Sequence, residues 1–143
     1  MKRFLVSLFL LCTSVAGFAA DRYWKDLPII EVVDGDTIQT KLVSLPYPLY
    51  NVKVRILGID TPEKNYLAKC DKEKQLGLQA TTKMGELIGT STLMTLKNAK
   101  WDKYGGRVDS EVIVNNINLG QRMIELGYAR PYSGTGPKPN WCQ

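Results

Sequence analysis

The chain has 143 residues, of which 44% are hydrophobic, and a formal net charge of +5 at pH 7. That length suits one domain with a real core, and the hydrophobic content excludes wholesale disorder. The modest charge mildly favours a polyanionic partner, but argues against a protein that grips nucleic acid through a long basic face.

Histidine is absent from the sequence. Its absence excludes Ser-His-Asp and Cys-His catalysis, histidine-ligated zinc and an imidazole general base. Any catalysis must therefore rest on carboxylates, arginines, lysines, tyrosines or a metal held by oxygen.

Residues 1–20 read as an export signal, and we assign residues 21–143 to one domain. Lys2 and Arg3 precede an apolar run over residues 4–12, and Gly17-Phe18-Ala19 approximates a small-x-small cleavage signal. The run is too short to span a membrane comfortably, so we expect a periplasmic or secreted protein without membrane association after cleavage. Removal of the two basic residues leaves 17 basic and 14 acidic residues, a charge of +3.

Three cysteines raise separate questions. Cys12 leaves a lipoprotein alternative open, although the leucines before it are bulkier than the usual residues before a lipidated cysteine. Processing would leave Cys70 and Cys142. In an oxidising compartment such an isolated pair favours a disulfide over two free thiols or a metal site. We predict a Cys70–Cys142 disulfide that ties the Gly/Pro-rich residues 133–140 to the domain and fixes the chain end away from the carboxylates.

The first half of the domain predicts three strands. Residues 21–27 form a polar lead-in, and strands follow over residues 29–33 and 37–43. Asp34-Gly35-Asp36 between them signals a hairpin, because Asp-Gly readily supplies positive φ. After a loop with two prolines, Val52, Val54 and Ile56 alternate along a third strand.

Beyond this strand, Thr61-Pro62 has the pattern of a helix N-cap followed by proline. A helix is predicted over residues 71–88, with Leu76, Ala80, Met84 and Leu87 on one face. Strands are predicted over residues 92–97 and 107–114, and Asn118 caps a short helix that Gly127 ends. This order is that of an OB-type five-stranded barrel with two helices.

Chemistry-bearing residues recur where predicted elements end. Asp36 lies in the hairpin, Arg55, Asp60 and Glu63 lie around the end of the third strand, and Arg107 follows a later turn. Each has an ordinary structural reading, since acids favour helix starts and arginines favour solvated edges. The ordinary account requires all of them to be accidental.

In order and chemistry these motifs resemble the thermonuclease family, whose best-known member is staphylococcal nuclease. The resemblance covers residues 29–132 and lacks the long C-terminal helix of that member. The matching motifs are Val33-Asp34-Gly35-Asp36-Thr37, Arg55 to Glu63, Asp102-Lys103-Tyr104-Gly105-Gly106-Arg107 and Gly127-Tyr128-Ala129-Arg130.

The resemblance implies a Ca²⁺ site formed by the carboxylates of Asp36 and Asp60 and the backbone carbonyl of Thr61. Glu63 would activate or orient the attacking water. Oxygen-only ligands favour Ca²⁺ over zinc. So few protein ligands predict a weak site, with a dissociation constant of about 10⁻⁴ to 10⁻³ M.

The resemblance also implies that Arg55 and Arg107 clamp the scissile phosphate and that Lys103 and Tyr104 contact the nucleotide. Cations belong there because the phosphate oxygens gain negative charge as water attacks. Arginine suits this task because its planar fork holds two oxygens at once. Two departures affect the second clamp: an extra glycine precedes Arg107, and Asp109 and Glu111 follow it closely.

We therefore expect an exported, monomeric, Ca²⁺-dependent nuclease that cuts DNA and RNA and leaves 3′-phosphates, as the family does. Single strands should be preferred, since a barrel groove admits an exposed backbone and unstacked bases more easily than a duplex. A catalytically idle OB-fold nucleic-acid-binding module and an exported protein-interaction domain remain alternatives. Glu63 counts against the idle module, because binding alone requires no general base.

Overall fold

The computed structural model describes residues 23–103 and 105–143. The export signal predicted over residues 1–20 and the nucleotide contact predicted at Tyr104 therefore lie outside the described residues. The strands are β1 (Tyr23–Asp34), β2 (Thr37–Lys41), β3 (Asn51–Ile56), β4 (Ile59–Asp60), β5 (Leu93–Trp101), β6 (Arg107–Val114), β7 (Ile117–Asn118) and β8 (Arg130–Pro131). The helices are α1 (Asp71–Ile88) and α2 (Leu119–Glu125).

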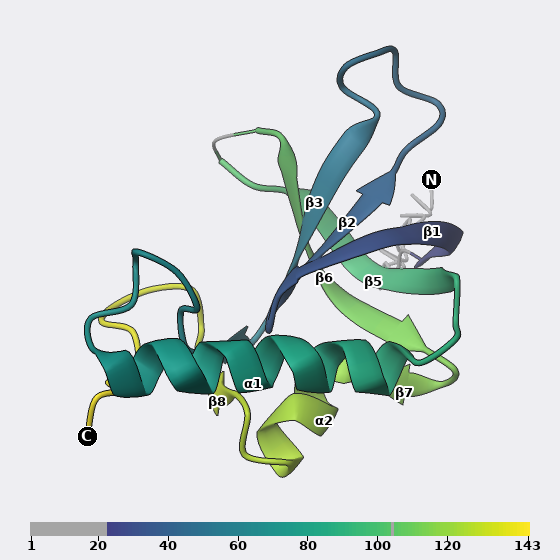
Figure 1. Ribbon diagram of the computed structural model, residues 1–143. Helices are drawn as coiled ribbons and strands as arrows, with labels where there is room; N and C mark the ends of the chain where they lie inside the picture. Colours follow the sequence, from purple (N-terminus) through teal and green to yellow (C-terminus); the bar gives the residue numbers. More distant parts are fainter. Residues whose placement is uncertain (1–22, 104) are drawn as a thin grey trace, which may run out of the picture.

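Five strands form a closed barrel (Figure 1). The sheet order is β3-β2-β1-β5-β6-β7, and a parallel pairing of β3 with the first half of β6 closes the barrel, while β7 pairs with the end of β6. Along β6 buried and half-buried residues alternate, so Val108, Ser110, Val112 and Val114 face inward. The OB-type five-stranded barrel with two helices is thus confirmed.

β1 is longer than its pattern indicates, because it serves two neighbours. It begins at Tyr23, inside the polar lead-in that was expected to precede the strand, and that expected strand start was wrong. Its first half pairs with β5 and its second half with β2. Asp26, with φ of 58°, lies at a register shift within the half that pairs with β5. A bulge of this kind bends and twists the strand locally.

Helix α1 has the predicted bounds and runs across one end of the barrel (Figure 1). Its buried residues are Glu73, Gly77, Ala80, Met84 and Ile88, a stripe at helical spacing. Helix α2 begins as predicted, because the Asn118 side chain accepts a 3.1 Å hydrogen bond from the Gln121 N–H. No helix of the described residues is long and apolar enough to cross a membrane.

Thr61-Pro62 does not begin a helix, so that interpretation was wrong. Residues 61–70 are irregular, and the N-cap of α1 is Cys70. The Thr61 N–H instead donates a 3.1 Å hydrogen bond to Oδ2 of Asp36, across the site. A long-range contact therefore fixes this segment where a local cap was expected.

The predicted Cys70–Cys142 disulfide is present, with the Cα atoms 6.1 Å apart. Residues 132–143, which we call the tail, contain no helix. β8 pairs with β4 just before the tail begins, so the tail starts beside Asp60. The expectation that the disulfide fixes the chain end away from the carboxylates was wrong, because Trp141 is hydrogen-bonded to Asp60.

Candidate active site

The turn between β1 and β2 places Asp36 and depends on close packing at Gly35. Gly35 is not among the positive-φ residues, so the conformational reason given for it was wrong. A Cβ atom there would lie 2.8 Å from Cβ of Ala80 and 2.9 Å from Oγ1 of Thr61. Glycine is needed because α1 and the Thr61 segment press against the turn.

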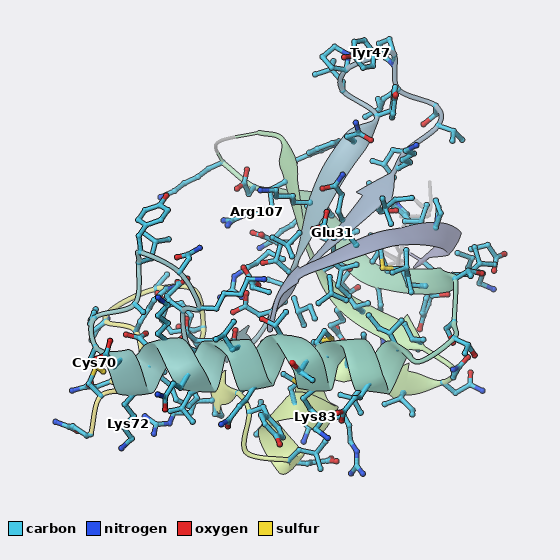
Figure 2. All side chains as sticks on the ribbon, in the orientation of Figure 1. Glu31, Tyr47, Cys70, Lys72, Lys83 and Arg107 are labelled. Carbon is cyan, nitrogen blue, oxygen red and sulfur yellow. A yellow bond between two sulfur atoms is a disulfide. The ribbon has the colours of Figure 1, made fainter. Side chains whose placement is uncertain are left out.

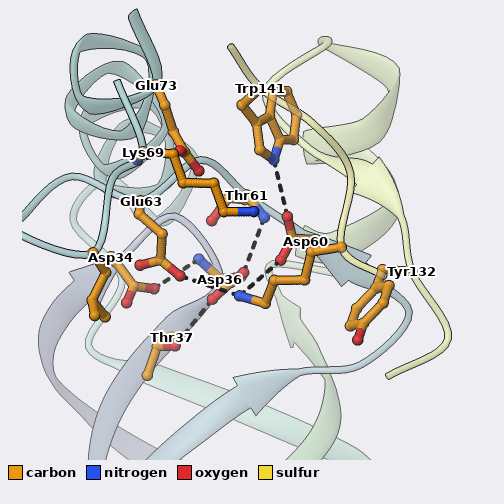
Figure 3. Close-up of polar contacts among 12 residues, drawn as sticks. Asp34, Asp36, Thr37, Asp60, Thr61, Glu63, Lys69, Glu73, Tyr132 and Trp141 are labelled. Carbon is orange, nitrogen blue, oxygen red and sulfur yellow. Dashed lines mark hydrogen bonds and ion pairs between the residues drawn. The ribbon is translucent and has the colours of Figure 1, made fainter. Parts of the chain in front are cut away.

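The Asp36 carboxylate joins three segments (Figure 3). Its Oδ1 accepts a 3.1 Å hydrogen bond from the Thr37 hydroxyl, and its Oδ2 accepts one from the Thr61 N–H. Oδ2 also forms an ion pair with Arg55. The side chain is buried, so these partners replace the water that a charged group would otherwise need.

Arg55, on β3, lies between the two aspartates assigned to the metal. Besides pairing with Asp36, its NH2 group donates a 3.1 Å hydrogen bond to the Ile59 carbonyl and lies 3.8 Å from Oδ1 of Asp60. Burial lowers the pKa of Arg55, and the Asp60 carboxylate opposes that shift. Since an arginine pKa starts so high, the side chain remains a cation at neutral pH.

Asp60 is 1% exposed and meets two residues of the tail. Its Oδ2 accepts a 2.9 Å hydrogen bond from Nε1 of Trp141, and its Oδ1 lies 3.2 Å from Nζ of Lys138. Nζ also donates a 3.1 Å hydrogen bond to Oε1 of Glu63. Burial alone would lower the pKa of Lys138, but Asp60 and Glu63 outweigh it and the pKa is raised.

Sequence reasoning missed Lys138 and Trp141 as site residues. No spacing pattern marks them, because they lie in the irregular tail. One signal was available for Trp141: it precedes Cys142, whose predicted disulfide brings the tail to Cys70 at the start of α1. The sequence analysis instead expected this disulfide to hold the chain end away from the carboxylates.

Arg107 begins β6, the parallel neighbour of β3, where Arg55 stands opposite Asp109. Its Nε lies 3.0 Å from Oδ2 of Asp102 and 3.8 Å from Oδ1 of Asp109. Asp109 therefore does reduce the positive charge near Arg107, as the sequence indicates. Glu111 instead accepts hydrogen bonds from Asn98 and Asn118.

A groove of about 840 Å³ brings the two arginines to one surface. In Figure 2, Arg107 projects from the barrel, whereas Tyr47 marks the tip of a loop far from α1. The residues that line the groove include none from this loop. Polar and aromatic residues of the groove include Arg55, Lys103, Arg107, Lys138, Trp101 and Tyr132.

The carboxylates offer the chemistry of a hard-cation site, but an incomplete one. Oδ1 of Asp60 is buried without a well-aligned hydrogen bond, and oxygen ligands of this kind suit Ca²⁺. Within residues 23–103 and 105–143, no three Asp, Glu, Cys or His side chains gather closely enough to hold an ion alone. Two carboxylates alone, those of Asp36 and Asp60, would leave the remaining positions of a bound cation to other ligands such as water or phosphate.

Comparison with known proteins agrees with this geometry. The family model described as staphylococcal nuclease homologue matches residues 53–140, which include every site residue named above except Asp36, Thr37 and Trp141, and the packing residue Gly35. An uncharacterized protein of Methanocaldococcus jannaschii is 30% identical over 125 residues, an alignment that covers 73% of this chain. The matched region spans 58% of that relative's length. The chain belongs to the staphylococcal nuclease homologue family.

Proposed function

We propose that this protein is an exported, Ca²⁺-dependent nuclease that hydrolyses phosphodiester bonds in both DNA and RNA and leaves 3′-phosphates. One observation carries the proposal: Asp36, Asp60 and Glu63 contact Arg55 or Lys138, and these two cations line a groove that Arg107 also lines. Family membership supports nuclease chemistry in general. The disulfide supports export, because such bonds persist in oxidising compartments.

In this proposal Glu63 is the general base, and the two arginines stabilise the charge that develops on phosphate. Glu63 is partly exposed, so water can reach it. Arg55 is held by Asp36 and the Ile59 carbonyl, which fixes its fork before substrate arrives. Asp36, Asp60 and the Thr61 carbonyl would hold Ca²⁺, which supplies Lewis-acid polarisation of the phosphate when bound.

The groove favours single strands as substrates. Trp101 and Tyr132 line it together with Lys100 and Lys103. Aromatic rings interleaved with cations bind unstacked bases and backbone phosphates without reading the sequence. We propose that the protein acts on such strands as a monomer.

Incubation with a supercoiled plasmid tests the nuclease function. The purified, disulfide-intact protein should nick the plasmid in Ca²⁺ and not in EGTA. Absence of nicking with Ca²⁺, Mg²⁺ or Mn²⁺ would contradict the enzyme. Retention of single-stranded DNA without cleavage would then identify the idle nucleic-acid-binding module.

A further inference from the structure

The tail passes next to the candidate site and is anchored near both of its ends. At its start, the Tyr132 N–H donates a 2.9 Å hydrogen bond to the Gly58 carbonyl. At its end, Trp141 is hydrogen-bonded to Asp60, and Cys142 forms a disulfide with Cys70. The Arg130 guanidinium stacks 4.2 Å from the centre of the Trp141 ring. The position of the intervening residues is therefore built into the fold.

Lys138 is the cation of the tail that contacts the carboxylates. Its Nζ lies 3.2 Å from Oδ1 of Asp60 and 3.1 Å from Oε1 of Glu63. Arg55 pairs with Asp36 but remains 3.8 Å from Asp60. Lys138 thus partly neutralises Asp60 and Glu63, the two carboxylates with which Arg55 makes no close ion pair.

We propose that Lys138 is an internal counter-cation that competes with a divalent metal for Asp60 and holds Glu63 until the metal displaces it. The inference rests on the proposed function for its use of a metal. An ammonium and a metal ion cannot both take the same Oδ1 lone pairs at close range. Linkage then requires that each weakens the binding of the other. Lys138 therefore sets the metal affinity of the site low.

A role for Lys138 as a direct phosphate ligand is the competing explanation. Lys138 lines the groove, but its ammonium is turned to the two carboxylates. A phosphate would have to draw it away from both. The counter-cation role requires only the contacts that are present.

The test is calorimetric titration of Ca²⁺ into the full disulfide-intact protein without nucleic acid. Lys138→Met should bind Ca²⁺ about 10-fold more tightly than the wild type, within the usual range of coupling between sites. Lys138→Arg, which keeps the charge, should stay near the wild type. Lys74→Met removes an exposed lysine from α1 and should leave the affinity unchanged. Circular dichroism verifies folding, and Lys138→Gln replaces the Met variant if that one unfolds.

Unchanged or weaker Ca²⁺ binding by Lys138→Met would overturn the inference. So would an equal gain in Lys74→Met, or no Ca²⁺ binding by any variant. Weaker retention of single-stranded DNA with unchanged Ca²⁺ affinity would identify the phosphate ligand instead. Because no nucleic acid is present, tighter Ca²⁺ binding without plasmid nicking would uphold the inference while removing the nuclease function.

Discussion

Trp141 donates its indole N–H to Oδ2 of Asp60 over 2.9 Å, a contact between residues 81 positions apart in the chain. Both side chains are buried, and Asp60 is an aspartate assigned to the metal. The hydrogen bond fixes one carboxylate oxygen and leaves the other turned toward the cations of the site. The tail therefore takes part in orienting the carboxylate.

Trp141→Phe should lower the free energy of unfolding by about 1–3 kcal/mol, because a buried charged acceptor loses its donor while a smaller aromatic ring keeps most of the apolar contact. Urea denaturation measures this loss. Trp101→Phe is the control, since Trp101 is 47% exposed and should cost little. Equal stability of the Trp141 variant and the wild type would show that this hydrogen bond contributes nothing.

Glu63→Gln should reduce kcat by about 10²- to 10⁴-fold with little change in substrate affinity, the usual contribution of a general base. Single-turnover cleavage of a short single strand and its binding to the same variant separate these quantities. Glu31→Gln, at an exposed position on β1, is the matched control. Near-normal turnover by Glu63→Gln would remove this residue from the mechanism.

Arg55→Lys and Arg107→Lys should each reduce kcat by about 10²-fold or more, although both preserve charge, because lysine cannot hold two phosphate oxygens in a planar fork. Arg122→Lys is a control on α2, where the arginine forms an ion pair with Glu125 one turn along the helix. Full activity of Arg107→Lys beside an inactive Arg55→Lys would show that the second clamp is misassigned.

Periodic patterns predicted both helices and most of the barrel strands. The bounds of α1 and β6 follow from alternation and helical spacing, which are local properties of the sequence. The first half of β1 could not be predicted in this way, because it becomes a strand only by pairing with β5. Likewise, β4 and β8 are two-residue strands that exist through each other.

The site residues that lie in family motifs could be predicted from the sequence. Those that the tail brings to the site could not. Asp36, Arg55, Asp60 and Glu63 are brought together as the motifs indicate. Lys138 reaches the same place only through the fold of the tail. A lysine in an irregular segment carries no local sign of which carboxylate it will meet.

The double variant Cys70→Ser/Cys142→Ser should be destabilised by about 4 kcal/mol at most, from chain entropy for cysteines separated by 72 residues. Because the tail also carries Lys138, which is proposed to compete with Ca²⁺ for Asp60, the Ca²⁺ concentration for half-maximal cleavage should fall in the same variant. Thermal denaturation and a Ca²⁺ titration of cleavage measure the two effects. Two alkylatable thiols in natively exported wild-type protein would contradict the disulfide itself.

Gly77 of α1 lets the helix lie directly against the backbone that carries Glu63. A Cβ atom at Gly77 would lie 2.5 Å from the Glu63 carbonyl carbon and 2.7 Å from the Lys64 nitrogen. Gly85, in the same helix, would meet nothing within 4 Å. Alanine variants at these two positions therefore distinguish the effect of helix propensity from the effect of close packing.

Gly77→Ala should be destabilising by about 1–3 kcal/mol despite alanine's better helix propensity, because the overlap is with backbone that cannot rotate away. It should also reduce kcat, since displacement of a catalytic group by about 1 Å can cost about 100-fold. Gly85→Ala should raise the free energy of unfolding by up to about 1 kcal/mol and should keep full activity. Urea denaturation and plasmid cleavage of both variants decide the matter: a Gly77→Ala protein as stable and active as Gly85→Ala would mean that the position of Glu63 does not depend on this contact.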